Sequence, residues 1–439
     1  MYDPQQLTFL GKINALIALG RIPLASEVPL WTIFGCILSA RLFPQTGSSS
    51  SLKDIDWLIV LQCAFITWAT NISINYGNEY FDWNLDRPGQ IDQIKKSIKL
   101  RNELENGHSN GNSGEETKYT EETKELQKEK QEEEMNEKIM GNTTRIIHDG
   151  TFPPYTALLL GIFWQGLVVA LILWSRSNDS SVSPTTTITS TIKKLANKRG
   201  TPFKGFALQI GIVSSILSQM YVGPPIRLHY HGFGELISAL LLNPVSILWG
   251  MTGYYTSTTK QTLSITDIFN KPPTSFTNTN TFSLGSLWIL LGAMYCFEQA
   301  RIFIMHIQDI EADIKGNKIT FVVRIGHKWA ARLYVLFNLL ALGLFRYFTN
   351  YIQTNKLNIN NQNKFVSGWI KGISLVLIYS IPIMLVTARS LFASIPPNRI
   401  TKSTGGLLPA LPLTTLPMIV SLQVLLSPIV LSIFTLMYW

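Results

Sequence analysis

The chain of 439 residues contains only three cysteines, and charged residues make up only 15% of it. Three cysteines are too few for a disulfide scaffold, and Cys36, Cys63 and Cys296 lie in apolar runs, as buried thiols usually do. Soluble domains carry about 25% charged residues. With 46% hydrophobic residues beside this shortage of charge, the composition argues against a soluble fold, a coiled coil or a collagen-like chain.

The few charges are unevenly distributed. Residues 95–145 hold ten Lys/Arg and twelve Glu, and two further tracts, 175–199 and 257–283, are rich in Ser/Thr and in Thr/Asn/Pro. Such polar segments bury too little apolar surface to offset the entropy lost on ordering. We therefore predict a disordered charged insertion at 95–145 and polar loops at 175–199 and 257–283.

Apolar segments dominate the rest of the chain. A bilayer core of about 30 Å is crossed by about 20 helical residues. Nine segments approach that length: Leu24–Phe43, Trp57–Phe81, Tyr155–Trp174, Gly205–Val222, Leu236–Tyr255, Leu284–Ile307, Ala330–Phe348, Trp369–Phe392 and Pro417–Tyr438. This pattern predicts an all-α polytopic membrane protein in which residues 1–439 form one transmembrane domain.

The net charge and the insertions bear on partners and location. The formal net charge is +9, but it comes without the interleaved basic and aromatic residues that bind nucleic acid. Lys and Arg at membrane edges account for it, so the expected surroundings are a lipid bilayer and not nucleic acid. The long Asn/Ser/Thr/Glu insertions are typical of eukaryotic chains and favour an endomembrane, such as the ER, or a mitochondrial membrane.

The second apolar segment runs directly into an acidic cluster. It continues into NYGNEYFDWNLDRPGQID, where Asn78, Asp82 and Asp86 are spaced by four and so share one face of a continuing helix. Asp92 follows a predicted break at Pro88-Gly89. Carboxylates at the C-terminal end of a helix oppose its dipole, so a compensating cation is expected there.

The sixth segment runs into a second acidic cluster, HIQDIEADIKGNKITFVVRIG, where Asp309 and Asp313 are again four apart. An even number of crossings separates the second and sixth spans, so both clusters face the same side of the membrane. Facing carboxylates repel at close range, and a divalent cation removes that conflict. Oxygen ligands favour Mg²⁺, with Mn²⁺ as the alternative, and Mg²⁺ commonly bridges carboxylates to substrate phosphates.

Several cations accompany the two clusters. Candidates for holding a diphosphate are Arg21, Arg227, Lys318 and Arg324. His229 and His231 are two residues apart with no Cys nearby, so we expect them to have a structural or interfacial role rather than to bind a transition metal.

Together these motifs resemble the UbiA superfamily of intramembrane prenyltransferases and are most similar to its MenA branch, the 1,4-dihydroxy-2-naphthoate polyprenyltransferases. The resemblance rests on N-x3-D-x3-D, on D-x3-D, on GRIPLAS before the first span and on YVGPPIRLHYHGFGEL between the fourth and fifth. The sequence departs from the branch at three places. Glu79 replaces Asp, Met305-His306-x-Gln308 replaces Asn-Asn-x-Arg, and Asn317 replaces Gly.

The resemblance implies nine helices around a central cavity open to lipid. It implies transfer of a polyprenyl group from an isoprenyl diphosphate to an aromatic, quinone-precursor-like acceptor. It also implies that Asp82, Asp309 and Asp313 are catalytic and, with Asn78 and Asp86, hold Mg²⁺. The residues implied for the substrate pocket are Tyr76, Asp92, Tyr221, Tyr254, Glu298 and His306.

Two alternatives stay open at the level of sequence. A terpene cyclase of the UbiA type would use the same ionisation site without a second substrate. An ion or small-molecule transporter would also place acids in the membrane, but it predicts acids near mid-span and inverted repeats. In this sequence the acids lie at the ends of spans.

Overall fold

The computed structural model describes residues 9–22, 24–43, 55–107, 147, 152–177, 204–259, 261, 285–354, 362–393 and 411–438. Within these ranges the ordered elements are helices, and no strand is present, so the predicted all-α class is confirmed there. Most of the three predicted polar segments lies outside the described residues, and their disorder stays a prediction. Along α3 (Trp57–Gly107), side chains are described only as far as residue 83.

Each of the nine predicted apolar segments coincides with a helical region. Seven regions are long and apolar enough to cross a membrane: Trp57–Trp83, Pro154–Leu173, Gly234–Thr259, Leu287–Glu311, Phe321–Thr354, Ser367–Ala393 and Leu413–Met437. The other two, α2 (Glu27–Leu42) and α8 (Gly205–Gln219), have 16 and 15 residues. The described part of the chain is thus a multi-pass helical membrane protein, with seven full-length candidate spans where nine were predicted.

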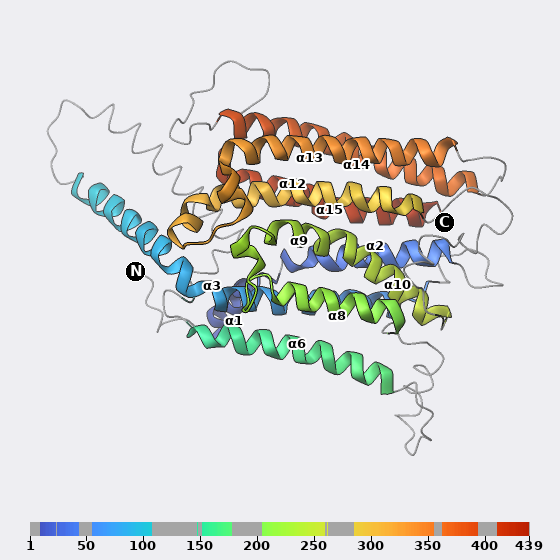
Figure 1. Ribbon diagram of the computed structural model, residues 1–439, viewed down its shortest axis with the longest axis horizontal. Coiled ribbons are helices and arrows are strands. Elements are labelled where there is room, and N and C mark those ends of the chain that lie inside the picture. The colour runs from blue at the N-terminus through green and yellow to red at the C-terminus, as the bar shows by residue number, and fades with distance from the viewer. Residues whose placement is uncertain are drawn as a thin grey trace.

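The helices form one bundle with roughly parallel axes (Figure 1). Besides α2, α3 and α8, it contains α6 (Pro154–Ser177), α10 (Ser246–Thr259), α12 (Gly285–Lys315), α13 (Phe321–Thr354), α14 (Gln362–Ala393) and α15 (Leu416–Met437). The main packed pairs are α12 with α13, α2 with α10, α3 with α6 and α14 with α15. The α12–α13 turn and the chain between α8 and α9 (Gly234–Leu240) lie at the end of the bundle from which α3 projects (Figure 1).

The predicted break at Pro88-Gly89 is wrong, because α3 continues through it to Gly107. A proline inside a helix costs about 3 kcal/mol. The residues that follow are rich in Gln, Lys, Leu and Glu, which favour helix, and they allow the helix to continue past this cost. Asp86 and Asp92 therefore both belong to α3, and residues 95–107 of the predicted insertion are helical.

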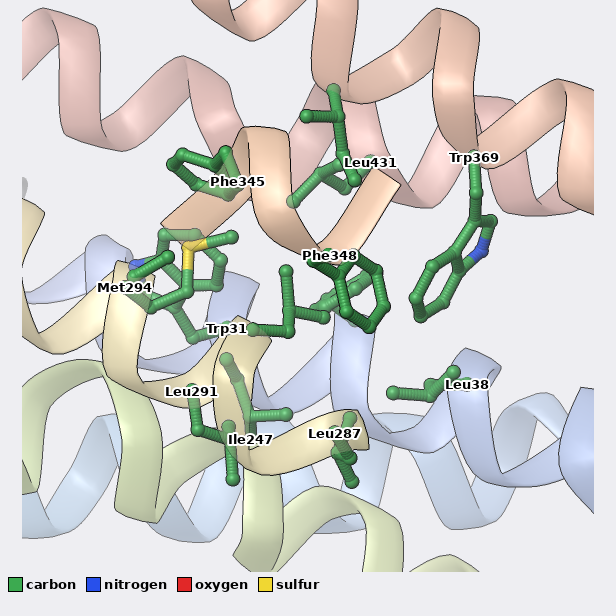
Figure 2. Close-up of a cluster of buried hydrophobic side chains, with 14 of the residues drawn as sticks. Trp31, Leu38, Ile247, Leu287, Leu291, Met294, Phe345, Phe348, Trp369 and Leu431 are labelled. Atoms are coloured by element: carbon green, nitrogen blue, oxygen red, sulfur yellow. The ribbon is translucent and has the colours of Figure 1, made fainter. Parts of the chain in front are cut away.

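The centre of the bundle is filled by large side chains from six helices (Figure 2). Trp31 of α2 meets Phe34 edge to face at 6.2 Å between ring centroids, and Phe348 of α13 lies 5.5 Å from Trp369 of α14. In a bilayer the lipid is as apolar as these side chains, so close packing, rather than exclusion of water, holds the helices together. Aromatic pairs of this kind contribute about 0.5–1.5 kcal/mol each.

Two glycines bring the backbones of α2 and α10 into direct contact. A Cβ on Gly35 would lie 2.2 Å from the carbonyl oxygen of Ile247, and one on Gly250 would lie 2.1 Å from that of Thr32. Small residues at a helix crossing allow this approach in membranes. The crossing holds Glu27 and Thr32 of α2 against the centre of the bundle.

Gly35→Ala is expected to destabilise the protein, because the neighbouring atom is backbone and cannot rotate away. Overpacking of this kind typically costs about 1–3 kcal/mol. The measurement is thermal unfolding of the full chain in detergent. Gly343→Ala on α13 is the matched control, since a Cβ there meets nothing within 4 Å. Equal melting temperatures for the two variants would show that the α2–α10 contact is not tight.

Candidate active site

Asp82, in the middle of α3, and Asp313, near the end of α12, meet at one buried lysine. Lys318 Nζ lies 3.0 Å from Asp82 Oδ2 and 3.9 Å from Asp313 Oδ1. All three residues are buried, with exposed fractions of 9% or less. Clusters from two helices far apart in sequence are therefore joined at the same end of the bundle, as the parity of the spans predicted.

A tight turn after α12 places Lys318. The backbone N–H of Lys318 donates to the carbonyl of Asp313 at 2.8 Å, which folds the chain back onto the helix end. Asn317 takes a left-handed conformation with φ 54° in this turn. Asn is among the side chains that tolerate this conformation best, so the replacement of Gly at this position is compatible with the turn.

Tyr230 completes the surroundings of Asp82. It lies in the short helix η4 (Leu228–His231), and its hydroxyl donates to Asp82 Oδ1. The guanidinium of Arg227 and the ammonium of Lys318 lie 5.6 and 5.8 Å from the centroid of its ring. Tyr230 was not predicted as a site residue, although it stands within the motif that supports the resemblance.

Arg21 reaches the same end of the bundle from the N-terminal segment. Its Nη2 donates to Glu79 Oε1 at 2.9 Å, and Glu79 is only 2% exposed. Asp82 and Asp309 also lie within electrostatic range of the guanidinium. The side chain of Arg21 is 40% exposed, so a cation predicted for diphosphate binding remains accessible to an anion. At the level of sequence, Glu79 was noted only because it replaces the Asp of the MenA branch.

Three aromatic rings meet beside these carboxylates. The ring centroids of Tyr221 and His306 lie 4.7 and 4.9 Å from that of His229, and the ring planes are tilted by 31° and 45°. Burial lowers the pKa of the His229 imidazole well below its ordinary value, and the charge of Lys318 lowers it further. The ring is therefore neutral at pH 7. Tyr221 and His306, both predicted for the substrate pocket, are thus brought to this end.

Two predicted pocket tyrosines hold helices together. The hydroxyl of Tyr76 donates to the carbonyl of Leu16 at 2.8 Å and holds α1 (Phe9–Leu19) against α3. The hydroxyl of Tyr254 accepts from the backbone N–H of Asp56 at 3.0 Å, at the start of α3. Asp82 lies 26 residues further along the same helix, about 39 Å away at 1.5 Å per residue. Tyr254 is therefore at the opposite end of the bundle.

Glu298, also predicted for the pocket, belongs to a separate buried ion cluster. Arg301 Nε donates to Glu298 Oε2 at 3.0 Å, and Arg301 Nη2 lies 3.2 Å from Glu27 Oε2. Asn243, in the π-helical turn η5 (Leu241–Val245), donates to Glu298 at 3.3 Å. The cluster joins α2, η5 and α12 inside the bundle.

The remaining predicted residues differ in accessibility. Asn78 is half-buried one turn before Asp82, Asp309 is exposed on α12, and Arg324 is exposed beside Gly232. The side chains of Asp86 and Asp92 lie outside the described residues.

An apolar cavity of about 270 Å³ lies between α3, α6, α8 and η5. Its lining includes Ile74 of α3, Val168 of α6 and Ile212 of α8. Ile74 precedes Asp82 by eight residues, about 12 Å along the helix. The cavity is therefore near the charged end but inside the apolar part of the bundle.

The fold and this end of the bundle define a multi-pass helical membrane protein with buried carboxylates and cations gathered at one end. No protein-family model and no curated protein matches the chain. One similar solved structure is that of a digeranylgeranylglyceryl phosphate synthase in membranes. It is 14% identical, with 96% of this chain and 99% of that chain covered and a TM-score of 0.45. At this level of similarity the function has to be argued from the residues of this chain.

Proposed function

We propose that the chain is a UbiA-type intramembrane prenyltransferase. It would transfer an isoprenyl group from an isoprenyl diphosphate to an aromatic, quinone-precursor-like acceptor of the dihydroxynaphthoate type. The observation that carries the proposal is the convergence of Asp82 and Asp313 on Lys318, because it joins the two acidic motifs on which the resemblance rests. The location in the ER or a mitochondrial membrane stays a prediction from composition.

A hard divalent cation prefers oxygen ligands, and the side chains of the two acidic motifs offer them. Asp82, Asp309 and Asp313 supply carboxylate oxygens, and Asn78 stands one turn before Asp82 on α3. These residues, with Asp86 of the same motif, would hold Mg²⁺ or Mn²⁺. The ion would supply positive charge that neutralises the diphosphate leaving group.

The chain's own groups account for the binding of the anion and the apolar chain. Lys318 and the accessible Arg21 would donate charge-assisted hydrogen bonds to diphosphate oxygens. Tyr230 holds Asp82 in place through its hydroxyl. The cavity beside Ile74 offers an apolar environment to part of an isoprenyl chain. A ring carbon of the acceptor would then attack the allylic carbon as the diphosphate leaves, and the ring proton would pass to Asp309.

The test is release of diphosphate from farnesyl and geranylgeranyl diphosphate by membranes that contain the protein, with and without Mg²⁺. We expect release to require Mg²⁺ and to fall about 100-fold or more in Asp309→Asn. Asp56→Asn is the matched control, because it removes a carboxylate just before α3, at the opposite end of the bundle. Equal rates in wild type and Asp309→Asn, or no release with either donor, would overturn the proposal.

Mass spectrometry of the lipid products, with and without dihydroxynaphthoate and hydroxybenzoate, separates transfer from cyclisation. A prenylated aromatic product that appears only with the acceptor supports the transferase. A hydrocarbon or alcohol formed without an acceptor would identify a cyclase instead.

A further inference from the structure

Beside the acidic site, two histidines and one aspartate form a compact cluster. His306 and Asp313 are two turns apart on α12, and His229 reaches them from η4. One nitrogen of each imidazole and one carboxylate oxygen all lie within 4.8 Å of one another. Among the described residues, this is the group of histidines, cysteines and acids that is arranged to hold a metal ion.

Each histidine of this cluster has one ring nitrogen without a partner in the described part of the chain. His229 is only 2% exposed, and these nitrogens are the Nδ1 atoms of His229 and His306. Asp313 Oδ2 accepts from Thr320 Oγ1 at 3.5 Å, and its Oδ1 lies 3.9 Å from Lys318 Nζ. A buried polar atom without a partner typically costs about 1–3 kcal/mol. A ligand that engages the two Nδ1 atoms would recover that cost.

The carboxylate of Asp313 gives the two imidazoles a negatively charged neighbour. Lys318 Nζ lies 3.9 Å from Asp313 Oδ1 but only 3.0 Å from Asp82 Oδ2, so its ammonium is held more closely by Asp82. A divalent ion at the histidines would be paired with the carboxylate of Asp313.

We propose that His229, His306 and Asp313 bind one divalent first-row transition-metal ion of the Zn²⁺ class. Two imidazole nitrogens with one carboxylate oxygen favour such an ion over Mg²⁺, which prefers oxygen alone. The ligands of this site thus differ in chemistry from those of the oxygen-ligated Mg²⁺ site proposed above. Asp313 has two carboxylate oxygens and could contribute one to each site. The metal-site proposal does not depend on the proposed reaction.

Metal binding would draw the three side chains together. At bond lengths of about 2.0–2.1 Å, two ligands of a tetrahedral ion lie about 3.4 Å apart. The present spacing of up to 4.8 Å would therefore close by up to about 1.4 Å when the ion enters. Three protein ligands leave a further position for water or for an oxygen of a bound substrate.

The experiment uses the full chain purified in detergent, stripped of metal, and then equilibrated with Zn²⁺ or Co²⁺ in excess Mg²⁺. We expect about one Zn²⁺ per chain by elemental analysis, and visible absorption bands of Co²⁺ bound to nitrogen. Loss of an outer-shell partner of a metal typically weakens binding about 10- to 100-fold. Loss of a ligand in His306→Ala or His229→Ala should therefore weaken it about 100-fold or more.

The matched control is His231→Ala, which removes an exposed histidine two residues from His229 and should leave binding unchanged. His306→Gln, which preserves more of the side-chain volume, replaces His306→Ala if the latter does not fold by circular dichroism. Absence of stoichiometric Zn²⁺ from the wild type overturns the proposal. So does binding that survives in the folded His306 variant. Because the readout is metal content, failure of the prenyl-transfer assay leaves this test unaffected.

Discussion

Replacing Asp82 with asparagine should lower the rate of Mg²⁺-dependent diphosphate release by about 100- to 1,000-fold, the effect expected when one preorganised electrostatic group is lost. Asp82 is the carboxylate that both Lys318 and Tyr230 hold at the charged end. Asparagine keeps the shape of the side chain but cannot balance a cation. The measurement is the initial rate of diphosphate release with a saturating isoprenyl diphosphate.

A double variant separates the loss of chemistry from a loss of fold. Asp82→Asn alone removes the carboxylate that lies 3.0 Å from the buried ammonium of Lys318, and breaking a buried pair typically costs about 3–5 kcal/mol. Removing both partners, as Asp82→Asn with Lys318→Met, should recover most of the stability. The double variant is expected to be folded and still inactive. Recovery of the wild-type rate in it would show that Asp82 matters only for folding.

Replacing Arg301 with methionine should lower the free energy of unfolding by about 3–5 kcal/mol. The substitution leaves two carboxylates, Glu27 and Glu298, buried side by side without a counter-charge. Inside a membrane protein such charges are stable only when paired. The measurement is unfolding of the purified protein in mixed micelles, followed by circular dichroism.

Arg332→Met on α13 is the matched control for Arg301. Arg332 is exposed and lies over the ring of Trp329 at 4.6 Å, a contact that contributes about 0.5–1 kcal/mol at exposed sites. Glu298→Gln should have an intermediate effect, because Arg301 keeps Glu27 as a partner. If Arg301→Met were no less stable than Arg332→Met, the buried cluster would contribute nothing to the fold.

The predictions that succeeded rest on local pattern. A run of about 20 apolar residues has few stable structures besides a membrane helix, and each predicted run is helical in the structure. Spacing of four places side chains on one helical face, and the number of crossings decides which side of the bilayer a helix end faces. Asp82 and Asp313 could therefore be assigned to one end before any contact was known.

The predicted pocket residues that the structure places in other contacts have no hydrophobic or helical spacing that indicates their position. An aromatic ring packs equally well at a substrate, at a helix crossing or at a helix end, so Tyr76 and Tyr254 carried no signal of their positions. Pairing of Glu298 with Arg301 follows from their spacing of three, but Glu27 comes from a helix far away in sequence. Tyr230 and His229 lie in the connection between α8 and α9. No hydrophobic periodicity in that connection predicts which way a side chain points.

The sequence by itself determined the class of protein, the helical segments and the shared end of the two acidic motifs, because these follow from local hydrophobicity, periodicity and parity. Only the tertiary structure decided that Lys318 joins the motifs, that Arg21 binds Glu79, and that His229 meets His306. These contacts depend on how helices rotate and cross one another. That geometry is set by side-chain packing over the whole bundle, which no local stretch of sequence encodes.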